Sequence, residues 1–543
     1  MSSSSSNSDK EEQDLLTTAI GNFGRWQLKI SLLMALLKFP IAWFTLSIVF
    51  LAPPTNFWCK QLPQYAYMDD ETWKNYSIPS NSTPKQEGLN SGYCLMNDLT
   101  GNEMTVPCQN GFSYNKSVFV KTIISEWNLV CGRQRLIDLS QISLMIGILT
   151  GNLLFGVLAD RHGRKTVLMV CIFLQSLFGI LASWIPWYWG FIISRFLLAI
   201  SNGGTIVTSF VMCMEIVGGK WRTIVPILYQ IPFGFGNSIM AGVAYFLRDW
   251  RYFHFTLSVL ACIYIVYIWC IPESPRWLIA AGRKEEAITI LRRAASVNRI
   301  DPRIIETSMI EISNSTKSNK EATNSSLAAL FSTPKLRKRS IILYTNWGLT
   351  GITFYAFSQY IGHVSTNIFL TVSTGGLIAF PGTILCIYLI SRYGRKYTIS
   401  TSYFILAGCC LGILFIPKGK FPYDWPRVGL AALGIVGKSV SVPALYLFTG
   451  ELYPTILRNA GVGVSVMFSR LGSMIAPLII SLEELSPFLP LLVLAIASIA
   501  EAILVLPLPE TKGAKLPETI DDLDDPKSEV EEKKGEYRSV SKD

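Results

Sequence analysis

Twelve apolar stretches, each long enough to cross a lipid bilayer as a helix, constrain this chain more than any other feature. The hydrocarbon core of a bilayer is about 30 Å thick, so a spanning helix needs about 20 mostly apolar residues. We expect spans at 28–52, 136–158, 166–185, 188–217, 223–247, 252–271, 341–361, 366–390, 397–416, 426–449, 459–480 and 488–506. Only 16% of the residues are charged, against about 25% in a soluble domain. The sequence therefore predicts an all-α membrane protein with twelve transmembrane helices in two halves of six.

The lysines and arginines between the spans predict which loops face the cytoplasm. Cytoplasmic loops are richer in Lys and Arg. The loops after spans 2, 4, 6 and 8 carry such residues, while the loop after span 3 has no charge and the loop after span 11 has only acids. The loops after spans 5 and 9 are exceptions, but the balance predicts a cytoplasmic N-terminus (1–27), central loop (272–340) and C-terminal tail (507–543). This distribution accounts for the net charge of +10 without a nucleic-acid partner, and the polar first residues predict no cleavable signal peptide.

The loop between the first two spans, residues 53–135, is then predicted to be an extracellular domain. Two features agree with this prediction. Four cysteines suit two disulfides in an oxidising space, with all three pairings open: Cys59, Cys94, Cys108 and Cys131. Three sequons predict glycosylation there: Asn75, Asn81 and Asn115.

A short loop motif recurs six spans later and indicates an internal repeat. Residues 156–165 read GVLADRHGRK after span 2, and YLISRYGRK follows span 8. Each copy has a glycine, Gly163 or Gly394, where one helix turns tightly into the next and a Cβ would clash. The repeat supports two six-helix halves on either side of the central loop, residues 272–340.

The chain resembles the major facilitator superfamily and, within it, the organic ion transporter family of organic cation, organic anion and carnitine transporters. The motifs that carry the resemblance are SEWNLVC at 125–131, GVLADRHGRK at 156–165, PESPRWL at 272–278, TGELYPT at 449–455 and PETKG at 509–513. The string KFPIAWFTLSIVFLAPP is similar to arthropod members related to carcinine and β-alanine transporters. The resemblance implies a plasma-membrane carrier in which two helical bundles rock around a central site.

The resemblance also implies gating residues at the cytoplasmic ends of the spans. In the first half these are Asp160, Arg161, Gly163 and Arg164. The corresponding residues of the second half are Arg392, Arg395 and Glu451. We expect these residues to stabilise one transport state by ion pairs and helix capping, without contacting substrate.

Charged residues inside spans are costly and therefore mark candidate functional sites. The basic candidates are Lys38, Lys438 and Arg470, whereas no deep carboxylate lies in spans 1, 5, 7, 8 or 11. Each has an alternative: Lys38 could face lipid, Lys438 could snorkel or bind a carbonyl, and Arg470 could be structural. By resemblance, an arginine at the Arg470 position is typical of anion and carnitine transporters, and an aspartate of cation transporters. The expected site is therefore net positive.

Aromatic and amide side chains are expected to complete this site. Span 5 offers Gln230 and Phe233, and span 7 offers Phe354, Tyr355 and Gln359. By resemblance, Phe354 and Tyr355 align with an aromatic pair that lines the family's cavity. The alternative is ordinary packing between helices.

These features favour a transporter of small organic anions or zwitterions, such as carnitine-like or carcinine- and β-alanine-like compounds. The alternative is an organic cation transporter that recognises amines through aromatic faces. An enzyme is not expected, because the three histidines belong to no metal-spaced or nucleophile motif. The expected partners are a small organic ion and the lipid bilayer, with no cofactor and no metal. The coupling ion stays open.

Overall fold

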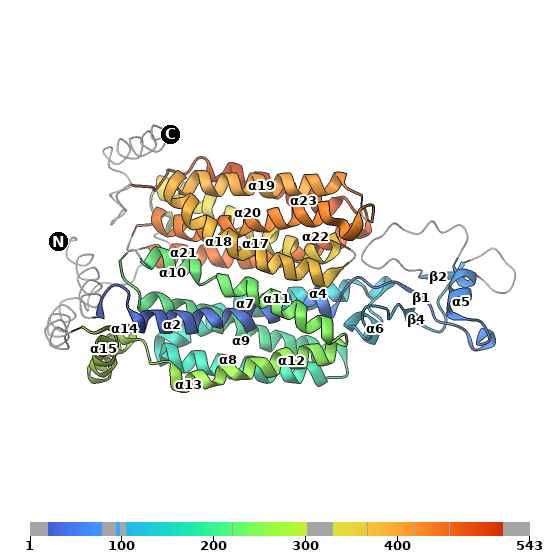
Figure 1. The fold of residues 1–543 in the computed structure, drawn as a ribbon, viewed down its shortest axis with the longest axis horizontal. Coiled ribbons are helices and arrows are strands. Elements are labelled where there is room, and N and C mark those ends of the chain that lie inside the picture. The colour runs from blue at the N-terminus through green and yellow to red at the C-terminus, as the bar shows by residue number, and fades with distance from the viewer. Residues whose placement is uncertain are drawn as a thin grey trace.

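The computed structural model describes residues 20–78, 94–97, 105–219, 221–300, 330–365, 367–417, 419–454 and 457–513. Long helices run side by side, and a small part with short strands extends from one end (Figure 1). Among these described residues, ten helical segments are long and apolar enough to cross a membrane. The shorter apolar helix α23 (Leu489–Val505) and the long helix α17 (Pro334–Val364) occupy the twelfth and seventh positions. The predicted twelve-helix architecture is confirmed.

The first half contains six predicted spans, three of which are broken into shorter helices. The helices are α2 (Arg25–Leu36), α3 (Lys38–Leu46), α4 (Ile48–Leu51), α7 (Arg135–His162), α8 (Arg164–Trp184), α9 (Tyr188–Glu215), α10 (Trp221–Leu228), α11 (Ile231–Phe246), α12 (Trp250–Cys262), η3 (Ile263–Val266) and α13 (Tyr267–Cys270). The break between α10 and α11 follows Pro226, and a second proline begins α11. Proline lacks the backbone N–H that an uninterrupted helix needs at these positions.

The second half follows two short helices, α14 (Pro275–Ala280) and α15 (Lys284–Asn298). It contains α17, α18 (Ile368–Tyr393), α19 (Arg395–Phe415), η5 (Pro422–Asp424), α20 (Trp425–Leu452), α21 (Arg458–Ser473), α22 (Ala476–Ser481), η6 (Leu482–Glu484) and α23. The predicted span at 459–480 is thus two helices. Helix α17 begins well before the predicted start at 341, because a helix can continue past the apolar region that hydropathy detects.

The Cys-bearing loop forms two small sheets, which lie on what we call the loop side of the molecule. Strand β1 (Phe57–Cys59) pairs antiparallel with β4 (Phe112–Tyr114), and β2 (Leu95–Asn97) pairs antiparallel with β3 (Thr105–Pro107). Of the three possible pairings, the disulfides join Cys59 to Cys108 and Cys94 to Cys131. Asn75, on α5 (Asp70–Ser77), and Asn115 are exposed, whereas the predicted glycosylation site Asn81 lies outside the described residues.

The SEWNLVC motif fastens this loop to the helical body. Its first residues form α6 (Ile123–Trp127), where Thr122 and Ser125 cap the helix reciprocally. The Glu126 carboxylate accepts hydrogen bonds from Trp250 Nε1 at 2.7 Å and from Arg251 at 2.5–3.1 Å. Burial raises the pKa of Glu126, but the bonds from Arg251 and Trp250 outweigh burial and hold this pKa below its usual value.

The buried apolar residues show where the two halves pack together. One cluster combines both halves and reaches the loop side, with Trp43, Phe50 and Phe253 from the first half beside Tyr355 and Tyr360 from the second. Two further clusters lie toward what we call the GRK side, where Gly163 and Gly394 lie. One of them is built from the first half together with α14 and α15, and the other from the second half together with one α10 residue. The halves therefore share a core on the loop side and have separate cores on the GRK side.

Candidate functional site

Arg470 lies where α21 crosses α17 at very close range. A Cβ on Gly351 of α17 would lie 1.9 Å from the Ser469 carbonyl oxygen, and a Cβ on Gly472 would lie 2.0 Å from the Gly348 carbonyl oxygen. Small residues permit such close helix packing in membranes. The approach brings the half-buried Arg470 against α17, where its guanidinium donates to the hydroxyl of Tyr355.

Lys38 approaches from the other half. It begins α3, is 7% exposed, and its Nζ lies 4.5 Å from the centre of the Tyr229 ring. Lys38 and Arg470 repel each other electrostatically. Within the described part of the chain, neither makes an ion pair with a carboxylate. Two cationic side chains from opposite halves therefore share one region, as the sequence predicts.

Aromatic rings surround this region and cross the boundary between the halves. Phe233 of α11 lies 6.3 Å from Phe354 of α17, measured between ring centres, and Phe354 lies 5.1 Å from Tyr355. Phe210 of α9 lies 6.3 Å from Tyr446 of α20. Sequence reasoning selected the first three rings and missed Phe210, Tyr446 and Tyr229, because aromatic residues are common in membrane helices and carry no distinguishing local motif. Gln230, also expected here, lies at the break between α10 and α11.

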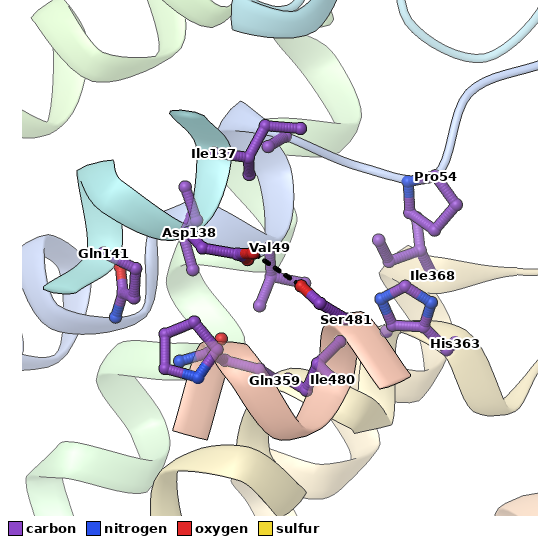
Figure 2. A pocket seen from close by; sticks show the side chains of 14 residues that line it. Val49, Pro54, Ile137, Asp138, Gln141, Gln359, His363, Ile368, Ile480 and Ser481 are labelled. Atoms are coloured by element: carbon purple, nitrogen blue, oxygen red, sulfur yellow. Dashed lines mark hydrogen bonds between the residues drawn. The ribbon is translucent and has the colours of Figure 1, made fainter. Parts of the chain in front are cut away.

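Gln359 belongs to a different part of the interface between the halves. It lines a pocket near the loop side together with Asp138, Gln141, His363 and Ser481, and neither Lys38 nor Arg470 lines this pocket. Figure 2 shows the hydrogen bond that crosses it, from Ser481 Oγ of α22 to Asp138 Oδ2 of α7 at 2.6 Å. The prediction that Gln359 sits beside Arg470 is therefore not supported by its position.

Lys438 also differs from the expected arrangement. Its ammonium group donates to Thr353 Oγ1 and lies 3.5 Å from Glu501 Oε1, inside the second half. The Glu501 carboxylate accepts from Thr353 at 3.0 Å, and the Lys438 Nζ lies 4.9 Å from the Tyr403 ring centre. Lys438 is 4% and Glu501 0% exposed. Its charge is thus balanced within the protein, which neither the cleft prediction nor the snorkelling alternative anticipated.

The predicted gating residues Asp160, Gly163 and Arg164 of the first half form a compact cluster on the GRK side. The Arg164 guanidinium binds Asp160 Oδ1 at 2.9 Å and Glu215 Oε1 at 3.1 Å. Glu273 caps the start of α8, since its carboxylate accepts from the backbone N–H groups of Arg164 and the following residue at 2.9–3.2 Å. Gly163 has φ +99°, and a Cβ there would lie 2.5 Å from Glu273 Oε2.

The second half repeats this arrangement. Arg395 binds both carboxylate oxygens of Glu451, at 2.8 and 2.9 Å. Glu510, just past α23, accepts from the backbone N–H groups of Arg395 and the next residue at 2.9 Å. Gly394 has φ +94°, and a Cβ there would lie 2.7 Å from Glu510. The predicted repeat is therefore also a repeat in side-chain contacts.

Two predicted gating residues lie outside these pairs, and three unpredicted ones lie within them. The exposed Arg161 lines a pocket with Asp160 and Glu215, and the Arg392 carbonyl accepts from Lys512 Nζ at 2.7 Å. Glu215, Glu273 and Glu510 were not assigned to the gates from sequence. The recurrence of PES and PET after the last span of each half was the available signal for two of them.

Comparisons with known proteins agree with this architecture. The family model described as "Sugar (and other) transporter" matches residues 65–522. The chain is 32% identical to solute carrier family 22 member 3 of Rattus norvegicus over 529 residues, which cover 93% of this chain and 94% of the relative. It is 30% identical to the organic cation transporter protein of Drosophila melanogaster, with 94% of each chain covered. It is 32% identical to solute carrier family 22 member 13 of Homo sapiens, covering 96% and 95%.

Solved structures support the same fold. The xylose transporter XylE from E. coli in an inward open conformation superposes with a TM-score of 0.62 at 16% identity, covering 90% of this chain and 98% of that one. The proton:xylose symporter bound to 6-bromo-6-deoxy-D-glucose gives a TM-score of 0.61 at 16% identity, covering 92% and 98%.

Motifs, family model and relatives agree on membrane transport of small organic substrates rather than on enzymatic catalysis. The chain is a multi-pass membrane protein with the major facilitator fold. It belongs to the sugar and other transporter family and, within it, is an organic ion transporter of the solute carrier family 22 type.

Proposed function

We propose that this transporter carries small organic anions or zwitterions, and that Arg470 and Lys38 bind the carboxylate of its substrate. The observation that carries the proposal is the pair of cationic side chains at the boundary between the halves, with no carboxylate partner among the described residues. A cation would be repelled there, whereas a carboxylate would neutralise a charge that is costly to keep in a membrane interior.

The chemistry of Arg470 suits a carboxylate. Its planar guanidinium can bind a carboxylate bidentately, and the Tyr355 hydroxyl beside it can hold the guanidinium in position. A hydrogen bond to a charged group contributes about 1.5–3 kcal/mol. That range corresponds to about ten- to more than a hundredfold in affinity. Phe233 and Phe354 supply faces for the remainder of the substrate, including the ammonium of a carnitine-like or carcinine- and β-alanine-like compound.

The second candidate is an organic cation transporter. It is favoured by relatives that carry that name and by the aromatic rings around the region. In this case the net positive charge would have to be offset by substrate contacts outside the Lys38–Arg470 region. We regard the cation reading as weaker because the described spans bring no carboxylate to Arg470 or Lys38.

Transport would proceed by rocking of the two halves in the plasma membrane. The positive-inside rule assigns the GRK side and both termini to the cytoplasm. The shared core on the loop side and the separate cores on the GRK side then correspond to a state closed toward the outside. The Arg164–Glu215 and Arg395–Glu451 pairs would hold the helices on the GRK side in fixed positions during this motion.

Tracer uptake into expressing cells tests the proposal. Four probes of similar size, one each neutral, cationic, anionic and zwitterionic, should show saturable uptake of the carboxylate-bearing pair. Arg470→Ala should raise the half-saturating carboxylate concentration at least tenfold at equal surface expression, and Arg470→Lys should recover little of it. Arg133→Ala, at an exposed arginine of the loop domain, is the matched control. Unchanged carboxylate uptake by Arg470→Ala, or uptake of the cation alone, would refute the proposal.

A further inference from the structure

A second arginine is buried in the first half, away from the proposed substrate site. Arg195 on α9 is 1% exposed. One of its N–H groups donates to Gln141 Oε1 of α7 at 3.1 Å, and the guanidinium lies 5.8 Å from the Phe191 ring centre. Its Nε and its other terminal nitrogen have no hydrogen-bond partner in the described part of the chain. No described carboxylate forms an ion pair with it.

The groups around Arg195 come from four helices and are almost all neutral. Gln141 Nε2 donates to the Thr45 carbonyl of α3 at 3.4 Å, and Asn202 Nδ2 of α9 donates to Thr45 Oγ1 at 3.2 Å. His254 of α12 is 1% exposed, interacts electrostatically with Arg195, and has no described partner for either ring nitrogen. Buried polar groups normally have hydrogen-bond partners. The unpartnered nitrogens of Arg195 and His254 therefore indicate that a further group binds here.

The nearest negative groups are already engaged or neutral. Tyr188, about two turns before Arg195 on α9, interacts electrostatically with both Arg195 and Asp138. Its hydroxyl donates to the Leu136 carbonyl at 2.5 Å. The Asp138 carboxylate accepts from Ser481 across the interface. The guanidinium charge is therefore not balanced by a direct partner.

The chemistry of the cluster selects an anion. A guanidinium offers only donors, and a neutral imidazole adds one more. A buried charge without a counter-charge costs several kcal/mol. Water could accept these hydrogen bonds but would leave the charge unbalanced.

We propose that Arg195, Gln141 and His254, here called the Arg195 cluster, bind a small inorganic anion of the size of chloride. Gln141 also lines the pocket of Figure 2, whose volume is about 50 Å³, so an ion in this pocket would reach the cluster past Gln141. Space of that order admits small ions rather than organic substrates. This site is separate from Arg470, so it can be occupied whichever organic substrate is transported.

Thermal unfolding of the purified full-length protein tests the site. Chloride is titrated against methanesulfonate, which has no carboxylate, at constant ionic strength, with bromide as a second halide. A ligand that binds the folded state raises stability as RT ln(1 + [L]/Kd), so the melting temperature should rise and then increase only logarithmically. Arg195→Gln should lose the chloride-dependent rise, and Arg470→Ala should retain it.

A second variant keeps the test decisive if Arg195→Gln fails to fold. Gln141→Glu introduces a carboxylate where Gln141 Oε1 already lies 3.1 Å from the guanidinium. It should melt as high without chloride as the wild type does with chloride, and show no further rise. An absent chloride effect in the wild type, or one that persists in Gln141→Glu, would overturn the proposal. A chloride effect abolished by Arg470→Ala alone would assign the anion to the substrate site instead.

Discussion

Replacing Lys438 with methionine should destabilise the second half strongly, because it leaves Glu501 as an uncompensated buried carboxylate. At the 3.5 Å between Lys438 Nζ and Glu501 Oε1, Coulomb attraction is about 5 kcal/mol at an effective dielectric constant of about 20. Desolvation offsets much of this in the intact pair, but breaking a buried pair typically costs about 3–5 kcal/mol.

The double variant Lys438→Met/Glu501→Gln separates a structural pair from a substrate contact. It removes both charges and keeps an oxygen that can accept from Thr353, so it should recover most of the stability lost in Lys438→Met. Melting temperatures in one detergent should therefore rank wild type, double variant, then single variant, and uptake should follow the same order. Lys29→Met, at an exposed lysine of α2, is the matched control.

One outcome would refute this reasoning. If Lys438→Met melts like the wild type yet loses carboxylate uptake, and the double variant does not regain it, Lys438 binds substrate. The contacts with Glu501 and Thr353 would then be incidental.

Three further predictions concern the loop and the gates. Acidification should destabilise the loop domain, because the pKa of Glu126 is held below its usual value in the folded protein. The stability that the Glu126 carboxylate contributes is fully present above about pH 4.3 and is lost as pH falls through the lower folded pKa. Glu126→Gln should lower the melting temperature at neutral pH and weaken the dependence of melting temperature on pH. Gly163→Ala should cost about 1–3 kcal/mol through its φ of +99° and reduce uptake, whereas Gly156→Ala, where a Cβ meets nothing within 4 Å, should melt like the wild type. Glycosidase should increase the gel mobility of the wild type more than that of Asn75→Gln/Asn115→Gln, and equal shifts would exclude both sites.

The spans and the repeated GRK turns could be predicted because each depends on local sequence. Mean hydropathy over about 20 residues reports burial in lipid, and the GRK turns need a glycine whose φ is positive, as Gly163 and Gly394 have. The pairing of Cys59 with Cys108 depends instead on where strands meet, so sequence left it open.

The side chains within the membrane were harder to assign. Lys438 and Glu501 are far apart in sequence, and hydropathy does not say which face of a helix looks inward. Arg195 lies inside the predicted span 188–217 and could have been found by the same criterion that selected Lys38 and Arg470. Gln359 lies a single helical turn beyond Tyr355, yet it lines the pocket near the loop side. A one-turn displacement along a spanning helix is enough to change the site that a side chain serves.

One capping glutamate in each half joins the end of that half to an earlier helix of the same half. Glu273 and Glu510 each follow the sixth span of their half and bind the start of its third, at α8 and α19. The segment after the last span of each half is thereby bound to the same half, so the proposed rocking would change contacts mainly at the boundary between the halves. The working unit of the second half consequently extends past its last apolar residue, to Lys512, whose Nζ also reaches the Arg392 carbonyl. A truncation or fusion point that keeps these contacts therefore lies beyond the PETKG segment, not at the end of α23.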